Sequence, residues 1–236
     1  MNPFELKTFA DAAALADEVA ALWLEQIKKR PAQTVALSGG RISRLFFQKV
    51  SERALAEEIF LSEIDFFWAD ERCVPPSDPE SNFALANETL FSLLNISPQK
   101  IHRLAGELEQ AEAVQEANRE ISRVISPSTN GQPALDLIFL GLGPDGHVAS
   151  LFPNAAPEVL HCDEPFLSIQ NSPKPPAHRL SLSYAAIAAA KEVWVLISGE
   201  GKESALRESL SGYGTTPLAN VLKSRFQTRI FTDLKL

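Results

Sequence analysis

The fold prediction rests on residues 135–153, LDLIFLGLGPDGHVASLFP. The run Leu135–Leu142 is apolar at nearly every position and then gives way to glycine, proline and aspartate. Strands that are apolar on both faces are typical of a parallel sheet covered by helices on both sides. The segment Gly141–His147 is therefore predicted to be a loop at the carboxyl end of a central strand.

The same alternation of strand and helix continues in both directions from this segment. Further strands are predicted at residues 34–37, 64–69, 100–104, 193–197 and 226–231. Helices are predicted at residues 11–30, 43–54, 82–94, 107–125, 147–151 and 185–190, and after residue 202. No linker separates two cores, so residues 1–236 are expected to form a single α/β domain with a mainly parallel sheet.

Composition excludes several classes of protein. Hydrophobic residues make up 45% of the 236 residues and charged residues 22%, which is typical of a globular protein and not of a disordered chain. A net charge of −8 argues against binding to nucleic acid or to an anionic membrane surface. The two cysteines, Cys73 and Cys162, offer neither a disulfide framework nor a zinc-ligand spacing, so no metal is expected.

The chain is also expected to be cytoplasmic. Its apolar runs are far shorter than the roughly 18 residues that a membrane span needs. The opening residues, MNPFELKTFADAAALADE, lack the basic flank and apolar core of a secretory leader.

Polar motifs follow the ends of four predicted strands: Ser38–Arg41, Asp70–Arg72, Gly141–His147 and Ser198–Lys202. In a parallel sheet all carboxyl ends lie at one edge, where ligands of open α/β folds bind. Loops that are far apart in the sequence are therefore expected to meet around one pocket.

The first loop, Ser38-Gly39-Gly40-Arg41, combines a hydroxyl, two glycines and a cation before a predicted helix. Glycines allow a close backbone approach to an anion, and free N–H groups at the helix start favour phosphate. A plain tight turn has the same composition. The loop is not a Walker motif, because no Gly-Lys-Ser/Thr follows it.

His147 is the predicted general base, and Asp145 is expected to orient its ring or to bind substrate. The alternative is a histidine that caps a helix. Asp70 and Arg72 are expected to orient water or substrate hydroxyls and to stabilise an oxyanion, the alternative being a structural ion pair. The remaining histidines, His102, His161 and His178, are expected on the surface, and Cys73 is expected to pack.

Lys174, Arg179 and Lys202 are candidates for a phosphate clamp, because charge-assisted hydrogen bonds to phosphate are strong. The prolines around Lys174 would stiffen its segment. Each cation could instead be a solvated surface charge.

Three segments resemble the 6-phosphogluconolactonase family: FFWADERCVPPSDPESNF (66–83), LDLIFLGLGPDGHVASLFP (135–153) and SPKPPAHRLSLS (172–183). The resemblance implies a Rossmann-like three-layer sandwich, shared with glucosamine-6-phosphate deaminase. It implies hydrolysis of 6-phospho-D-glucono-1,5-lactone in the oxidative pentose phosphate pathway, without metal or cofactor. The expected partner is this small sugar phosphate lactone, and the chain is expected to be a monomer or a weak homo-oligomer.

By motif, His147 resembles the family's general base and Arg72 a cation that contacts substrate. The predicted catalytic residues are His147, Asp70, Arg72 and Asp145. The predicted substrate and phosphate ligands are Ser38, Gly39, Gly40, Arg41, Gly143, Lys174, Arg179 and Lys202. The family usually has Ser-Thr-Pro or a similar run after Ser-Gly-Gly, whereas Arg41-Ile42-Ser43 follows here. Arg41 is therefore expected either to bind phosphate or to close the site.

Two rival functions remain. A deaminase–isomerase would use Asp70 as a second base, but that family has a Phe-Asn-Glu run after its histidine loop, and here Val148–Pro153 contains no acid. A non-catalytic sugar-phosphate sensor is the other rival. No DNA-binding module is visible in the sequence.

Overall fold

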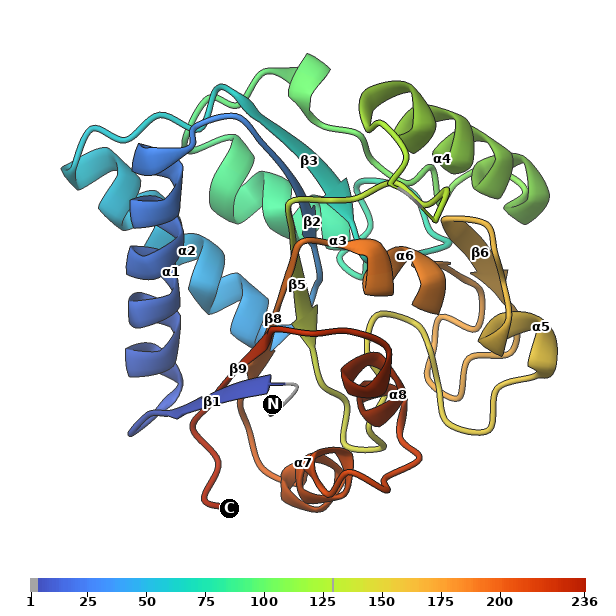
Figure 1. Ribbon diagram of the computed structural model, residues 1–236. Helices are drawn as coiled ribbons and strands as arrows, with labels where there is room; N and C mark the ends of the chain where they lie inside the picture. Colours follow the sequence, from blue (N-terminus) through green and yellow to red (C-terminus); the bar gives the residue numbers. More distant parts are fainter. Residues whose placement is uncertain (1–3, 129) are drawn as a thin grey trace.

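The structure of this chain is a computed structural model that describes residues 4–128 and 130–236. Residues 1–3 and 129 of the predicted domain lie outside the described residues. The described chain forms a large sheet between helices and a second, smaller sheet beside it (Figure 1).

The large sheet has six strands, and every pairing within it is parallel. In chain order the strands are β1 (Phe4–Thr8), β2 (Gln33–Leu37), β3 (Ile64–Trp68), β5 (Leu137–Gly141), β8 (Glu192–Ile197) and β9 (Thr228–Thr232). They lie in the order β1-β9-β8-β5-β2-β3, so the sheet grows in opposite directions on either side of the β2–β5 pair. The predicted α/β class with a mainly parallel sheet is confirmed.

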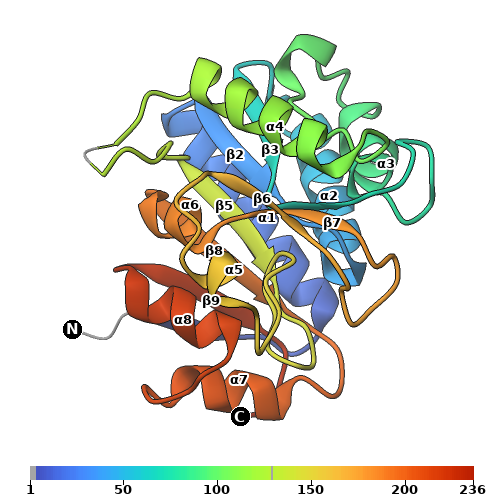
Figure 2. The same cartoon turned by 90° about the vertical axis from the view of Figure 1, so that its right-hand side faces the viewer.

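Helices cover both faces of this sheet. The α-helices are α1 (Ala12–Lys29), α2 (Arg41–Ala56), α3 (Asn82–Ala86), α4 (Gln110–Val124), α5 (Pro157–Leu160), α6 (Tyr184–Ala189), α7 (Glu203–Leu210) and α8 (Pro217–Ser224). Figure 1 shows α1 and α2 on one side and α4, α6 and α8 on the other, and Figure 2 shows the latter group in front of the sheet. This arrangement is the predicted three-layer sandwich.

The helix ends follow the sequence signals. The Asp11 side chain accepts a hydrogen bond from the Ala14 N–H and begins α1, and Lys28 and Lys29 lie in its last turn. Cations there interact favourably with the helix dipole. The inward face of α1 buries Trp23 completely, with its ring centroid 5.1 Å from that of Phe139 on β5. Aromatic packing thus fixes the helix layer against the strand that leads to Gly141–His147.

The second sheet was not predicted. It consists of β4 (Asp70–Arg72), β7 (Arg179–Leu182) and β6 (Phe166–Ile169), which pair antiparallel in the order β4-β7-β6. Asp70–Arg72 was expected to be a loop, but its backbone pairs with that of β7, with Asp70 opposite Ser181 and Arg72 opposite Arg179. A strand of three polar residues carries no apolar alternation, so no local pattern predicts it.

Two further predictions of local structure were wrong, and a third was right in part. The expected strand at 100–104 is a single bridge from Ile101 to Phe66 after a short 3-10 helix, η2 (Pro98–Lys100). The expected helix at 82–94 is confirmed as far as Phe91, with α3 followed directly by a π-helical turn, η1 (Asn87–Phe91). The expected helix at 147–151 is a tight turn closed by a bridge between Val148 and Leu151.

Three elements outside the second sheet were also missed: β1, the short helix α5, and α8. The strand β1 lies at the edge of the sheet and pairs only with β9. It is therefore mostly exposed, and it carries no apolar run that would reveal it in the sequence. The helix α8 begins at Pro217, after Thr216, whose side chain accepts from the Ala219 N–H.

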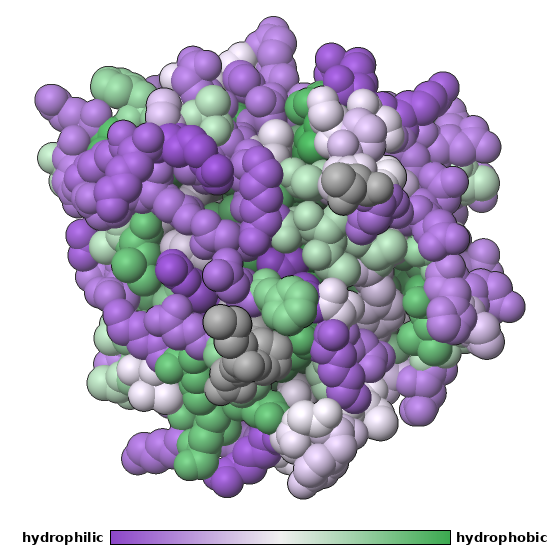
Figure 3. Space-filling view, viewed as in Figure 1, coloured by the Kyte–Doolittle hydropathy of each residue, from purple (hydrophilic) through white to green (hydrophobic). Residues whose placement is uncertain are grey.

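The surface is largely polar. Figure 3 shows a mainly hydrophilic face with separate hydrophobic areas. Within residues 4–128 and 130–236, no helix combines the length and the apolar character that crossing a membrane requires.

Candidate active site

The four polar motifs surround one cavity of about 160 Å³ at the carboxyl ends of β2, β3, β5 and β8. The position matches the place where the order of the strands reverses, which is where open α/β sheets bind ligands. The cavity is lined by Ser38, Gly39, Gly40, Arg41, Ile42, Asp70, Arg72, Asn82, Gly141, Leu142, His147, Ala149, Arg179, Ser198 and Lys202. The predicted convergence of the loops is therefore confirmed.

Three of the predicted site residues do not line this cavity: Gly143, Asp145 and Lys174. Gly143 and Asp145 instead contact the side chain of His147 from behind. The Lys174 Nζ lies 3.8 Å from Asp145 Oδ1, with the lysine side chain 42% exposed. Gly143 and Asp145 therefore contact the cavity through His147, and Lys174 contacts it through Asp145 and through its carbonyl, which accepts from Arg179.

His147 and Asp145 form a hydrogen-bonded pair. Nδ1 of His147 lies 2.5 Å from Oδ1 of Asp145. An ionised carboxylate only accepts hydrogen bonds, so Nδ1 carries the proton and Nε2 keeps a free lone pair. Among the alternatives for His147, a helix cap is wrong, because the segment that follows is a turn and not a helix.

The electrostatics of the pair favour a neutral imidazole. Burial lowers the pKa of His147 below its ordinary value, and the hydrogen bond and negative charge of Asp145 oppose this shift only in part. Burial is the largest single influence on Asp145 and disfavours its ionised form, but the hydrogen bond and charge of His147, the charge of Lys174 and a backbone hydrogen bond together outweigh it, so the pKa of the carboxyl is lowered. At pH 7 the pair is therefore a neutral histidine held by an ionised aspartate, which is the state that a general base requires.

The first loop leads into the uncapped start of α2. Gly40 has φ = 102° and no side chain caps the helix, so the first N–H groups of this 16-residue helix face the cavity region without a side-chain acceptor. A Cβ at Gly39 would lie 1.8 Å from Asn82 Oδ1, so only glycine fits there. The Ser38 hydroxyl donates to the Phe139 carbonyl at 2.9 Å, which leaves its oxygen lone pairs to face a ligand.

Cations without acidic partners surround the cavity. Within the described residues, Arg41, Arg179 and Lys202 form no salt bridge to a carboxylate. Burial, together with the nearby charge of Arg72, lowers the pKa of Arg179. Burial, together with the charge of Arg41, lowers the pKa of Lys202. Partly desolvated cations that repel one another are stabilised by a bound anion.

Arg179 also holds the proline-rich segment that precedes it. Its Nε and Nη2 donate to the backbone carbonyls of Lys174, Pro175 and Pro176 at 3.1–3.2 Å. A ligand phosphate could therefore use only its remaining donors. Arg41 reaches across the cavity, since a Cβ at Gly199 would lie 3.4 Å from its Nη2.

The Asp70–Arg72 segment presents alternate side chains to different surroundings, as a strand does. Asp70 and Arg72 line the cavity, whereas Glu71 is buried. Burial raises the pKa of Glu71, and four hydrogen bonds from Ser81 and from the backbone N–H groups of residues 72, 82 and 83 offset this only in part. Arg72 Nη1 donates to the Glu80 carbonyl at 2.6 Å and lies 3.3 Å from its carboxylate.

Sequence reasoning missed Asn82 as a cavity residue. Its Nδ2 donates to the Asp70 carbonyl at 2.8 Å, and its N–H donates to Glu71. The signal was present in the Ser81-Asn82 pair, since the Ser81 side chain accepts from the Ala84 N–H and starts α3. Ser198 was noted only as part of its motif, and it lines the cavity while donating to Asp233.

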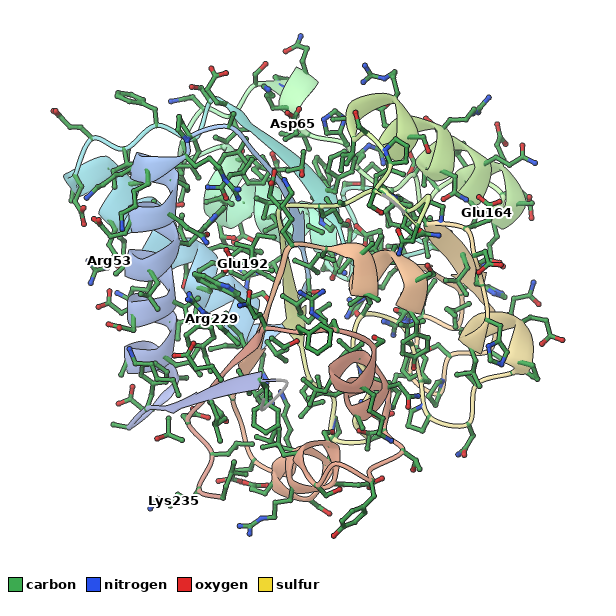
Figure 4. All side chains as sticks on the ribbon, viewed as in Figure 1. Arg53, Asp65, Glu164, Glu192, Arg229 and Lys235 are labelled. Carbon is green, nitrogen blue, oxygen red and sulfur yellow. The ribbon has the colours of Figure 1, made fainter. Side chains whose placement is uncertain are left out.

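One prediction about the remaining histidines was wrong. His102 is buried, and its ring stacks on that of Phe67. Its burial is tolerated because both ring nitrogens have partners, Glu120 at 2.7 Å and Asp65 at 3.0 Å. Figure 4 labels Asp65 at the amino end of β3, at the edge of the sheet opposite the cavity. Across residues 4–128 and 130–236, no group of His, Cys, Asp and Glu has the arrangement of a metal site.

Comparison with known proteins identifies the family. The model of the family described as glucosamine-6-phosphate isomerases/6-phosphogluconolactonase matches residues 8–230. The chain belongs to this family. The resemblance carried by the three sequence segments is thereby confirmed.

Relatives within the family cover most of the chain. A 6-phosphogluconolactonase of Streptomyces coelicolor is 33% identical, over 89% of this chain and 84% of its own length. One of Haemophilus influenzae is 37% identical, over 79% of this chain and 75% of its own. The crystal structure of 6-phosphogluconolactonase from Thermotoga maritima superposes with a TM-score of 0.81 at 28% identity, over 97% of this chain and 98% of the other.

Proposed function

We propose that this chain is a lactone hydrolase that converts 6-phospho-D-glucono-1,5-lactone to 6-phospho-D-gluconate, a step of the oxidative pentose phosphate pathway. The observation that carries the proposal is the His147–Asp145 pair at a cavity that also holds four cations. The relatives that cover most of the chain bear the name of this activity.

The charge of the cavity supports this substrate. Its cations are Arg41, Arg72, Arg179 and Lys202, and its single carboxylate is Asp70. The substrate brings a phosphate dianion and develops one further negative charge on the carbonyl oxygen during hydrolysis. This excess of positive charge stabilises a phosphate and a developing oxyanion, even though Arg72 is also paired with Glu80.

Phosphate binding would fix the lactone. The start of α2 at Gly40, together with Lys202 and the free donors of Arg179, would hold the phosphate. This places the lactone ring toward His147, on the loop that follows β5. A substrate fixed in this orientation reacts faster, because the entropy cost of orienting it is already included in the free energy of binding.

His147 would then act as the general base. Nε2 takes a proton from water as the water oxygen attacks C1, and the carbonyl oxygen becomes an oxyanion next to Arg72 or loop N–H groups. The tetrahedral intermediate collapses with cleavage of the C1–O5 bond, and the imidazolium returns its proton to O5. Asp145 stabilises the imidazolium in between. Such a base contributes typically about 10²–10⁴-fold.

The deaminase–isomerase reaction has less support. It requires a second base for carbon deprotonation, and the segment Val148–Pro153 that follows the histidine provides no carboxylate. Asp70, the second base that this reaction would use, does line the cavity, so the preference for the lactonase rests on the missing carboxylate after the histidine and on the names of the relatives.

The test is hydrolysis of the lactone, generated in situ and followed as acid release above the spontaneous rate. We expect a saturable acceleration that His147→Ala removes. Turnover of glucosamine 6-phosphate instead would establish the deaminase. Binding of 6-phosphogluconate without turnover of either substrate would establish a sensor.

A further inference from the structure

Ser150 lies in the tight turn three residues after His147 and is fully buried. The turn is closed by the bridge between Val148 and Leu151, and Ala149 within it has φ = 50°. A serine hydroxyl with no exposure to solvent must find its partners inside the protein.

Both polar groups of Ser150 reach the second sheet. Its Oγ lies 2.7 Å from Asp70 Oδ2 on β4, and its N–H donates to Ser181 Oγ on β7 at 3.2 Å. Asp70 and Ser181 are opposite each other in the β4–β7 pairing, so one residue contacts two facing positions of the sheet. The loop that carries His147 is thereby joined to the strand that carries Asp70.

The directions of these bonds are determined. The Ser181 hydroxyl donates to the Leu182 carbonyl at 3.0 Å, so it accepts from Ser150. The Ser150 hydroxyl donates to the Asp70 carboxylate oxygen. The one other side chain hydrogen-bonded to this carboxylate within the described residues is Asn82, with Nδ2 at 3.4 Å from Oδ1 and a shorter bond to the Asp70 backbone carbonyl.

We propose that Ser150 is a positioning residue that holds the Asp70 carboxylate in a fixed place relative to His147. The inference rests on the proposed lactonase function. Asp70 is the only carboxylate lining the described cavity, and the charged groups with which it interacts are His147 and Arg179. A carboxylate in a cation-rich sugar site accepts hydrogen bonds from sugar hydroxyls, and its orientation decides which hydroxyls it meets.

The experiment compares Ser150→Ala with Ser181→Ala. Both variants remove a buried hydroxyl from the same network, but only the first removes the bond to Asp70. We expect Ser150→Ala to lower kcat/KM for the lactone by about 10- to 100-fold, the size of a hydrogen bond to a charged group. Ser181→Ala is expected to change it by less than about threefold, with a comparable loss of thermal stability.

A double-mutant cycle with Asp70→Ala separates positioning from general damage. If Ser150 acts through Asp70, adding Ser150→Ala to Asp70→Ala changes kcat/KM by less than about twofold. If turnover by Asp70→Ala falls to the spontaneous rate, the same cycle is measured with calorimetric Kd values for 6-phosphogluconate. An undiminished effect of Ser150→Ala in the Asp70→Ala background overturns the proposal, as do equal effects of the two serine variants.

The same data distinguish this inference from the proposed function. A wild-type chain that does not accelerate lactone hydrolysis refutes the proposed function. A wild-type chain that does, together with a fully active Ser150→Ala variant, refutes the positioning role alone.

Discussion

The imidazole of His147 occupies the space that a side chain at Gly143 would need. A Cβ at position 143 would lie 2.0 Å from His147 Nδ1 and 2.1 Å from Cε1. The Gly143 N–H also donates to the His147 carbonyl at 2.9 Å. The absence of a side chain at Gly143 therefore leaves room for the ring of His147, the proposed base, although Gly143 does not line the cavity.

Replacing Gly143 by alanine should displace the ring of His147. We expect kcat to fall by at least about tenfold, since a misplaced base loses much of its contribution. Binding of 6-phosphogluconate, measured by calorimetry, should change little. Gly212→Ala is the control, because a Cβ there meets no atom within 4 Å, while φ = 82° still costs stability. Equal losses of kcat in the two variants would contradict the steric argument.

Removing the proposed base, His147, should reduce kcat far more than it weakens ligand binding. His147→Ala is expected to lower kcat by about 10²–10⁴-fold. The Kd for 6-phosphogluconate should stay within about threefold, because the proposed phosphate site, at Lys202 and the start of α2, does not include His147. The control is His161→Ala, at an exposed position outside the cavity. Wild-type kcat in His147→Ala would refute the assignment.

The pH dependence follows from the surroundings of His147. Only the neutral ring accepts a proton, so kcat/KM falls as pH drops through its pKa. Burial lowers that pKa, so the acid limb of wild type should have its midpoint below 6.5. Asp145 opposes the shift, so Asp145→Asn should move the limb to still lower pH. It should also reduce kcat, because the ring loses the partner that fixes its tautomer.

Lys174 provides a control for which the expected shift of the acid limb has the opposite direction. Its positive charge lowers the pKa of His147, so Lys174→Met should move the acid limb to higher pH. The measurement is kcat/KM between pH 4.5 and pH 8 for all three proteins, roughly the range over which histidines titrate. Shifts of Asp145→Asn and Lys174→Met in the same direction would show that other groups control the limb.

Removing a cation of the proposed phosphate site should raise KM. Lys202→Met is expected to raise KM for the lactone by about 10- to 100-fold, with a smaller change in kcat, because a charge-assisted bond is lost in both the ground and the transition state. Lys191→Met is the matched control, since Lys191 precedes β8 at the opposite edge of the sheet and pairs with Asp136. A fall in kcat at unchanged KM would instead place Lys202 at the reacting carbonyl.

Stability depends on a second buried cation, Arg225. Its Nη1 donates to the carbonyls of Ile187 and Ala190 at 2.8 and 3.0 Å at the end of α6, and burial lowers its pKa to about 10. Arg225→Met would remove a buried donor from both carbonyls and leave that of Ile187 with only the Ala190 N–H at 3.4 Å, so the free energy of unfolding in urea should fall by about 2–4 kcal/mol. Arg229→Met, at the half-exposed arginine labelled in Figure 4, should cost about 1 kcal/mol or less. Equal losses would contradict the role of burial.

The sequence was sufficient for five of the six strands of the large sheet, all but β1, and for the edge that carries the site. Continuous apolar runs such as Leu137–Gly141 are buried on both faces, and this burial fixes a parallel sheet with helices on either side. Given such a sheet, the motifs after β2, β3, β5 and β8 had to meet at one edge. Cavity residues as distant as Ser38 and Lys202 were predicted in this way.

The tertiary structure alone decided which side chains touch. Asp70–Arg72 became a strand because β7, more than a hundred residues later, supplied its hydrogen-bond partners. The same pairing separated Glu71, which is buried, from Asp70, which faces the cavity. His102 was expected at the surface, but Asp65 and Glu120 converge on it from other elements. Local patterns reveal periodicity and turn chemistry, whereas long-range pairing depends on groups that are distant along the chain and close only after folding.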